Sequence, residues 1–229
     1  VIHLAAKISV SESIKNPSET FEVNVEGTKN ILKACQKNNI KKLIVASSAA
    51  VYGESFPNVK LTEESKINPI SPYGESKVKM EKEIREFESK HEIDCIILRF
   101  FNIFGIGQSP EYAGVITKFM EKITQDKHLE IFGDGLQTRD FVAIDDVISS
   151  IHNSMKFGKS GTYNIASGKI TTINELAKFM ISISGKEIEI KHLSELIGDI
   201  RNSQADITLA KHELGFSPKH GLEKIKELL

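Results

Sequence analysis

Two short apolar runs, KLIVASS at 42–48 and DCIILRFF at 94–101, decide the fold class. Apolar runs of this length, rich in isoleucine, leucine and valine, are typical of strands buried on both faces of a sheet. Between them, from Tyr73 to about His91, apolar residues recur at helical spacing in a charged segment. A strand, a helix and a second strand in this order predict a parallel sheet covered by helices, which is an α/β fold.

The same alternation continues toward both ends of the chain. Further strands are predicted at 1–6, 128–132, 162–166 and 187–192. Further helices are predicted at 17–37, at 145–155, at 173–184, after Gly114 and near the C-terminus. Asp145 and Asp146 are expected to cap the helix that they open, because acidic side chains are favourable at a helix N-terminus. We infer two lobes, the second of them built from discontinuous pieces.

The composition is that of an ordinary folded protein of 229 residues. Lysine and arginine number 30 against 31 aspartate and glutamate, so the chain lacks the basic field that nucleic-acid binding needs. No apolar run is long enough to span a bilayer and no leader pattern opens the sequence, so we expect a cytoplasmic protein with no membrane partner. Cys35 and Cys95 form no CxxC pair, which argues against a disulfide framework and a thiolate zinc site.

The most informative polar residues are Tyr73 and Lys77, with Ser47 and Ser48 upstream. Residues four apart share a helix face, so the Lys77 ammonium is expected to lie near the Tyr73 hydroxyl. A nearby positive charge favours phenolate, and we therefore expect the pKa of Tyr73 to be lowered toward neutrality. Such a tyrosine is a usable general base for a sugar or alcohol hydroxyl. The serines end a predicted strand, at the edge where open α/β sheets place their active sites. An accidental pair on a charged helix is the alternative.

Three other patterns are better explained without a ligand. The GKS at 158–160 lacks the glycine that a phosphate-binding loop needs five residues earlier, where Asn153 stands. The GxG at 105–107 lacks the third glycine of a dinucleotide fingerprint. The seven histidines show no ligand spacing and the acidic pair at 145–146 fits a helix start, so no metal is expected.

Eight segments carry a resemblance across nearly the whole chain. In order they are HLAA at 3–6, NVEGTKNIL at 24–32, SSAAVYG at 47–53, SPYGESK at 71–77, RFFNIFG at 99–105, GDGLQTRDF at 133–141, YNIASG at 163–168 and GDIRNSQAD at 198–206. With these segments the sequence resembles the extended short-chain dehydrogenase/reductase family, and within it the nucleotide-sugar epimerase/dehydratase group. The resemblance implies a partial Rossmann-type parallel sheet, NAD as cofactor and a UDP-sugar as substrate. The expected cofactor domain is 1–104 with 142–168, and the expected substrate-binding lobe is 105–141 with 169–229.

The resemblance also implies roles for individual residues. Tyr73 is the catalytic base, Lys77 holds the nicotinamide ribose, and Ser48 bonds the reacting hydroxyl. The other residues expected beside the cofactor are Ala5, Ala6, Asn24, Ser47 and Phe100. The residues expected to bind the substrate, besides Ser48, are Asn102, Arg139 and Arg201. The chain has four arginines, and one inside GDGLQTRDF is better explained by a bidentate grip on a diphosphate than by a solvated turn.

The sequence departs from the family pattern at two places. Leu196 stands where the family usually has an arginine for the diphosphate, which leaves Arg201 as a partial substitute. The glycine-rich strand–turn–helix with which the family opens, whose backbone approaches the cofactor pyrophosphate, has no counterpart here. We therefore expect a truncated epimerase that binds NAD weakly or not at all. Its exposed apolar edge at residues 1–6 is expected to cause poor expression or aggregation.

The residues after Ser48 favour one reaction of this group. The resembling dehydratases carry an Asp-Glu pair there and the related decarboxylases keep the Glu, whereas this chain has Ala49 and Ala50. We therefore predict NAD-dependent 4-epimerisation of a UDP-hexose through a 4-keto intermediate, with UDP-glucose/UDP-galactose or their N-acetylated forms as substrates. The alternatives are a nucleotide-sugar dehydratase or decarboxylase, and a non-catalytic remnant of such an enzyme.

A homodimer is also expected. The segments near 17–37 and 73–91 match the helices through which the resembling family dimerises as a four-helix bundle. The apolar residues Val78, Ile84 and Phe87 exceed what one sheet face needs, and we expect them to take part in this contact.

Overall fold

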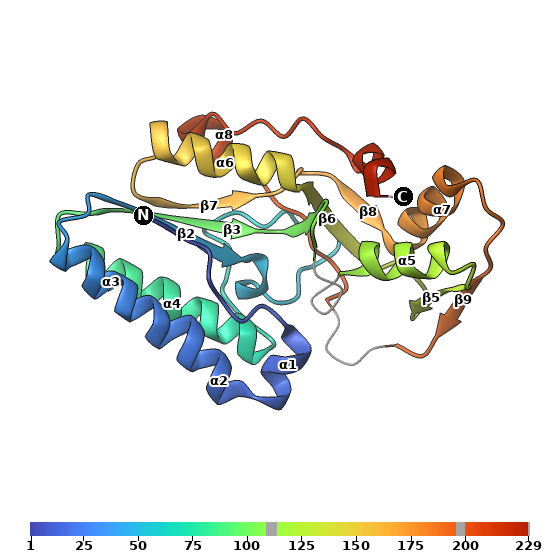
Figure 1. Cartoon of the computed structure of the whole chain (residues 1–229), viewed down its shortest axis with the longest axis horizontal. Coiled ribbons are helices and arrows are strands. Elements are labelled where there is room, and N and C mark those ends of the chain that lie inside the picture. Colours follow the sequence, from blue (N-terminus) through green and yellow to red (C-terminus); the bar gives the residue numbers. More distant parts are fainter. Residues whose placement is uncertain (109–113, 196–199, 229) are drawn as a thin grey trace.

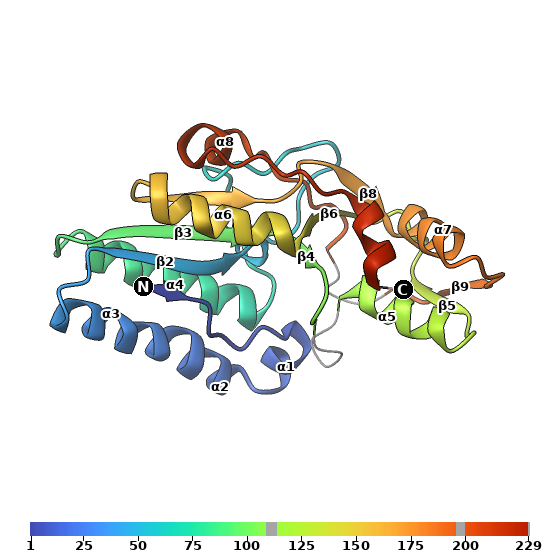
Figure 2. The ribbon, with the colours of Figure 1, turned by 45° about the horizontal axis from the view of Figure 1, so that its top comes forward.

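The computed structural model, shown in Figure 1, describes residues 1–108, 114–195 and 200–228. A larger lobe built on a parallel sheet lies at one end, and a smaller lobe of short strands and helices lies at the other (Figure 1 and Figure 2). Helices cover both faces of the larger sheet, which confirms the predicted α/β class. Within these ranges, no helix is both long enough and apolar enough to cross a membrane.

The strands form three sheets in the described part of the chain. The order β1-β2-β3-β7 makes a parallel four-stranded sheet, β4-β6-β8 a three-stranded sheet and β5-β9 a two-stranded one. The bounds are β1 Ile2–His3, β2 Lys42–Ser48, β3 Asp94–Phe100, β4 Asn102–Phe104, β5 Leu129–Phe132, β6 Thr138–Ala143, β7 Gly161–Ile165, β8 Ile170–Thr172 and β9 Ile190–Leu193. Ser48 pairs in register with Phe100, so β2 and β3 end at the same edge, which faces the smaller lobe (Figure 1).

Helices α1 to α4 lie on one face of the four-stranded sheet, and α6 and α8 lie on the other (Figure 2). Helices α5 and α7 belong to the smaller lobe. The bounds are α1 Val10–Lys15, α2 Pro17–Phe21, α3 Gly27–Lys37, α4 Pro72–Glu88, α5 Val115–Thr124, α6 Ile144–Phe157, α7 Ile173–Ser184 and α8 Thr208–Leu214. A π-helical turn, η1, spans Glu22–Glu26, and two 3₁₀ helices, η2 and η4, span Ala49–Val51 and Leu222–Leu228.

The single helix predicted at 17–37 is an α–π–α run. Pro17 stands at its first turn, where a missing N–H costs nothing. The π turn η1 inserts one extra residue per turn and directs Asn24 and Val25 into the interior. π turns of this kind are frequent at functional sites, and this one brings Asn24 against the segment that follows β1.

Three apolar clusters form the core among the described residues, one on each face of the larger sheet and one in the smaller lobe. The larger lobe packs the sheet between the helix layers, and its core includes residues Ala205 to Phe216 around α8. The smaller lobe packs α5 and α7 against β5, with Phe104 and Phe141 contributed by β4 and β6. The apolar side chains at 205–216 thus pack with the sheet of the larger lobe.

Several elements differ from the sequence-based expectations. The short elements α1, β4, β6 and β8 were not predicted. Asp145 and Asp146 do not cap α6, because the residue at the N-cap is Ala143 and no side chain bonds there. The buried Asp146 carboxylate instead accepts the backbone N–H groups of Lys219 and His220, each at 3.0 Å, and so anchors the segment after α8. Leu196, which stands where the family usually has an arginine, lies outside the described residues.

The first strand has an exposed apolar edge, as expected. Val1, Ile2 and Leu4 are 50%, 43% and 53% exposed, because β1 has β2 as its neighbour on one side only. Both cysteines are free and buried.

Candidate active site

The site is built where α4 begins against the end of β2. Ser71 caps α4 by accepting the Gly74 N–H at 3.1 Å, and Pro72 occupies the first turn. A Cβ on Gly74 would lie 2.6 Å from the Ala50 carbonyl oxygen, so only glycine lets the helix approach this closely. This contact delivers Tyr73, the residue before Gly74, to the carboxyl edge of the sheet.

Ser48 is the last residue of β2 and the N-cap of η2. Its hydroxyl oxygen accepts the Ala50 N–H at 3.1 Å, which fixes the side chain at the strand end. The Ser48 side chain lies next to the Tyr73 hydroxyl, where it acts to lower the pKa of that phenol. The structure thus brings together Ser48 and Tyr73, which lie 25 residues apart in the sequence.

Lys77 lies one helical turn after Tyr73 and is 2% exposed. Its Nζ donates to the Ala46 carbonyl oxygen at 2.8 Å and lies 5.9 Å from the centroid of the Tyr73 ring. Burial lowers the pKa of Lys77 to about 8, and the negative charge of Glu81 opposes this shift. The predicted pairing of Lys77 with Tyr73 is therefore present, with the ammonium beside the ring.

The expected lowering of the Tyr73 pKa is wrong for the protein as the structure shows it. Burial raises the pKa of Tyr73, and the Ser48 side chain only partly opposes the rise. The physical reason is that desolvation disfavours the phenolate, while the Lys77 ammonium lies over the ring and is itself poorly solvated. Tyr73 is accordingly a protonated phenol in this state.

Asn24 and Ser47, both expected beside the cofactor, make bonds within the protein. Asn24 Oδ1 accepts the Lys7 N–H at 2.8 Å, and its amide donates to the Lys7 carbonyl and to Ser76 Oγ. Asn24 thereby joins the segment after β1 to α4. The Ser47 hydroxyl donates to Glu81 on the same helix. The exposed Ala5 and half-buried Ala6 follow β1, and the half-buried Phe100 ends β3, so all three lie at the carboxyl edge.

The residues expected to bind the substrate lie in β4, in β6 and, for Arg201, between β9 and α8. The Asn102 amide donates to the Asp140 carbonyl at 3.2 Å, and Arg139 is half-buried and donates to the Thr138 carbonyl. Arg201 forms an exposed ion pair with Asp134 at 2.5 Å. The structure places Asn102 against the backbone of Asp140, the residue that follows Arg139 in β6, whereas Arg201 is bound to the turn at 133–135.

Asp140 was not predicted as a site residue, although it organises this part of the molecule. Its fully buried carboxylate accepts four hydrogen bonds, from the Ser167 N–H and hydroxyl and from the N–H groups of Gly168 and Ala205. Burial raises the pKa of Asp140 to about 6, against the effect of these donors. The one feature of the sequence that could have indicated a role for Asp140 is its position, directly after Arg139 and before the apolar run FVA.

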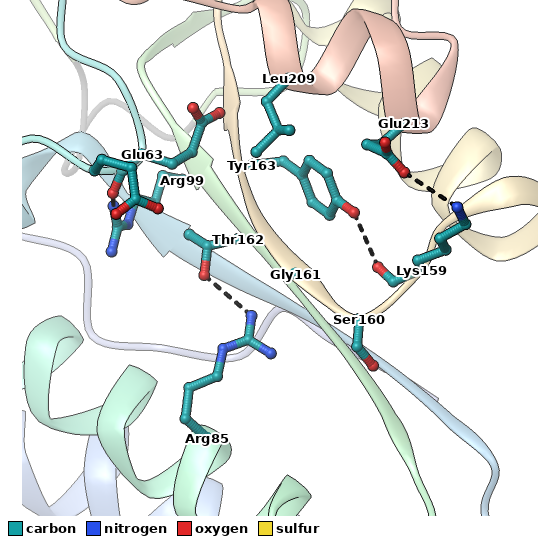
Figure 3. A pocket seen from close by; sticks show the side chains of 11 residues that line it. Glu63, Arg85, Arg99, Lys159, Ser160, Gly161, Thr162, Tyr163, Leu209 and Glu213 are labelled. Atoms are coloured by element: carbon teal, nitrogen blue, oxygen red, sulfur yellow. Dashed lines mark hydrogen bonds and ion pairs between the residues drawn. The ribbon is translucent and has the colours of Figure 1, made fainter.

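A separate groove lies at the free edge of β7 (Figure 3). It has a volume of about 410 Å³, and most of its charged side chains pair with one another or with the protein. Arg85 donates to the Thr162 hydroxyl at 3.0 Å, and Lys159 lies 3.6 Å from Glu213.

Within the described residues, no group of three or more histidine, cysteine or acidic side chains could hold a metal.

The carboxyl-edge residues fit the nicotinamide-ribose half of NAD. The Lys77 ammonium has three donors, and the described part of the chain engages one of them with an oxygen acceptor. A ligand hydroxyl beside Lys77 would complete its hydrogen bonding. The small side chains of Ala5 and Ala6 present little bulk at the same edge, where a flat ring would lie. Lys77, Tyr73 and these alanines are the residues that would hold the cofactor.

Known proteins match nearly the whole chain. The model of the NAD dependent epimerase/dehydratase family matches residues 1–166. A putative UDP-glucose 4-epimerase of Methanocaldococcus jannaschii is 39% identical over 235 residues, which cover 98% of this chain and 75% of that protein. The structure of a UDP-glucose 4-epimerase from Thermotoga maritima, solved with UDP-glucose, has a TM-score of 0.93 at 35% identity and covers 99% of this chain and 74% of that one.

A second solved structure matches equally well. It is a UDP-N-acetylglucosamine 4-epimerase from Methanobrevibacter ruminantium in complex with UDP-N-acetylmuramic acid. Its TM-score is 0.93 at 37% identity, and the match covers 99% of this chain and 74% of that one. With the family model on more than half of its length and relatives above 30% identity, the chain belongs to the NAD-dependent epimerase/dehydratase family.

Proposed function

We propose that this protein is an NAD-dependent 4-epimerase of a UDP-hexose. The observation that carries the proposal is the meeting of Ser48, Tyr73 and Lys77 at the carboxyl edge of the sheet. A buried phenol with a hydroxyl partner and an adjacent ammonium is equipped to exchange a proton with a sugar hydroxyl. The cofactor lies on the larger lobe, and the UDP-sugar reaches from this edge to the smaller lobe.

The residues of the chain manage the proton and the geometry. Tyr73 first releases its phenol proton to solvent, because burial keeps it protonated in the protein alone. The phenolate then takes the proton of the 4-hydroxyl as the carbonyl at carbon 4 forms, and it returns that proton in the reverse step. Ser48 holds the same oxygen, because the Ala50 N–H fixes its own hydroxyl oxygen beside Tyr73. Lys77 binds ribose hydroxyls and favours the phenolate electrostatically. NAD, when bound, supplies reversible hydride exchange with carbon 4.

The substrate class is set by what the relatives share. One solved relative carries UDP-glucose and another is named for UDP-N-acetylglucosamine, and both substrates combine a uridine diphosphate with a pyranose. We assign the diphosphate to the neighbourhood of Asn102 and Arg139, since Asn102 lies against the backbone of Asp140, the residue that follows Arg139. Arg201 would join them only by exchanging Asp134 for the ligand.

We predict that oxidation at carbon 4 leads to epimerisation and not to loss of water from the sugar. Elimination of water across carbons 5 and 6 needs an additional base and acid, but Ala49 and Ala50 in η2 can neither donate nor accept a side-chain proton. Incubation with UDP-glucose and NAD should therefore yield UDP-galactose, or the N-acetylated pair should interconvert, without net NADH. NMR of the reaction mixture tests this, and a stable 4-keto-6-deoxy sugar would overturn the assignment.

We also propose a homodimer through α3 and α4, as in the resembling family. The apolar residues that suggested it do not support it, because Ile84 is fully buried and Val78 and Phe87 pack against the protein's own core. The outer faces of these helices carry ion pairs instead, including Lys29 with Glu83 at 3.4 Å. We expect a dimer by light scattering at tens of micromolar that weakens as salt is raised. A monomer at low salt would contradict the proposal.

We place the protein in the cytoplasm. Two free, buried thiols, Cys35 and Cys95, suit a reducing compartment.

A further inference from the structure

Three residues of α4 spaced by four positions share the helix face that meets the end of β2. Each is held by a different residue of that strand, and the three pairs are Ser48–Tyr73, Ala46–Lys77 and Ser47–Glu81. We name these three pairs the polar ladder. Two of them carry groups that the proposed mechanism uses, and the third, at Glu81, is so far without a function.

Glu81 is held from its other side by Arg99 of β3. The guanidinium donates to both carboxylate oxygens, with Nε at 3.0 Å and the second nitrogen at 2.7 Å. The remaining nitrogen donates to the Tyr52 hydroxyl at 2.9 Å and to the Glu63 carbonyl at 3.1 Å. Figure 3 shows Arg99 beside Glu63 at the wall of the groove. The Glu81 and Arg99 side chains are only 11% and 7% exposed, so this ion pair is largely shielded from water.

The charged and titratable groups around Lys77 come from α4 and β1 of the described chain, and Arg99 of β3 adds a positive charge on the far side of Glu81. Glu81 and Tyr73 lie on α4 itself, and Glu81 is the anion among them. His3 of β1 faces Lys77, and both burial and the lysine charge lower the pKa of His3, so it adds no negative charge. β2 contributes only the neutral Ala46 carbonyl and Ser47 hydroxyl.

We propose that Glu81, clamped by Arg99, is a positioning residue: it fixes the rotation of α4 about its axis and supplies the counter-charge that keeps Lys77 an ammonium. Glu81 fixes the rotation of α4 because it anchors one end of the polar ladder, which binds the same helix face over two turns. If α4 turned about its axis, the bidentate ion pair between Glu81 and Arg99 would break. The counter-charge follows from the surroundings of Lys77, where Glu81 is the one anion beside it in the described part of the chain. The inference deepens the proposed function and rests on it for the effect on turnover.

The test is Glu81→Gln, read first by the titration of Lys77 in the protein without ligands. With ¹³C-labelled lysine, the Lys77 signal is assigned by its loss in Lys77→Met and followed by NMR against pH. We expect the midpoint to fall by about one pH unit relative to the unchanged protein, because an opposite charge at close range is removed. In epimerisation we expect kcat to fall about tenfold with KM within about twofold, since a misplaced helix affects the transition state most.

Glu88→Gln is the matched control. Glu88 also lies on α4 and also pairs with an arginine, Arg85 at 2.6 Å, while its second oxygen accepts the Cys95 N–H. It docks the same helix two turns farther from Lys77, so its loss should lower stability and leave the Lys77 midpoint unchanged. If Glu81→Gln does not fold, Glu81→Gln/Arg99→Met removes both charges of the buried pair, a change that proteins tolerate better than an unpaired charge.

An unchanged Lys77 midpoint in the Glu81 variant, or an equal shift in Glu88→Gln, overturns the inference. A protein that epimerises no UDP-hexose refutes the proposed function instead. The titration still decides the role of Glu81 in that case, because it needs neither substrate nor cofactor.

Discussion

Tyr73→Phe is expected to lower epimerisation turnover by about 10³-fold while leaving UDP-sugar affinity within about twofold. The substitution keeps the ring, which is buried against the start of α4, and removes the hydroxyl that exchanges the proton of the sugar. The hydroxyl acts on a proton in transit, so its loss raises the barrier more than it weakens the ground-state complex. Steady-state kinetics and calorimetric titration with the UDP-sugar measure the two quantities separately.

Tyr163→Phe provides the matched control for this experiment. Tyr163 is also a buried tyrosine, but its hydroxyl donates to the Lys159 carbonyl at 3.1 Å at the groove on the far edge of the sheet (Figure 3). Turnover should stay within about twofold of the unchanged protein, because this hydroxyl is remote from the carboxyl edge. Near-normal turnover in Tyr73→Phe would remove Tyr73 from the mechanism.

The long and regular elements of both lobes could be predicted from the sequence. β2 and α7 occupy the expected residues, since an uninterrupted apolar run and a 3.6-residue pattern with a Thr172–Glu175 capping box are strong local signals. β4, β6 and β8 are short, and TRDFVA at 138–143 mixes charged and apolar residues without a strand period. Their pairing depends on contacts far away in the chain, which a local pattern does not contain.

The site was predictable to the extent that its spacing is local. Tyr73 and Lys77 share a helix turn, and Ser48 is a strand end, so their meeting followed from the periodicities of helix and sheet. The direction of the Tyr73 pKa was missed because it depends on burial, which spacing does not report. The anchoring roles of Asp140 and Asp146 were missed for a related reason, since their partners lie at 167–168, 205 and 219–220.

Lys77→Met is expected to abolish turnover and at the same time to stabilise the protein. The methionine stem fills the space of the lysine stem, while the ammonium that holds the ribose and favours the phenolate is lost. Burial places the pKa of Lys77 at about 8, below its usual value of 10.5, so the folded protein bears a cost for keeping this charge at neutral pH. That cost is about 3 kcal/mol at most, and we expect the variant to gain about 1–3 kcal/mol at pH 7.

The pH dependence separates this cause from a general packing effect. Between about pH 8 and 10.5 the folded protein has released the Lys77 proton while the unfolded chain still binds it, so the free energy of unfolding of the unchanged protein rises with pH in this window. In Lys77→Met this contribution is absent, and the advantage of the variant at pH 7 should vanish by about pH 10.5. Urea unfolding at the two pH values measures both effects without substrate or cofactor. If Lys77→Met were less stable than the unchanged protein at pH 7, the prediction would be wrong. That result would show that the hydrogen bond to the Ala46 carbonyl stabilises the protein by more than burial of the ammonium destabilises it.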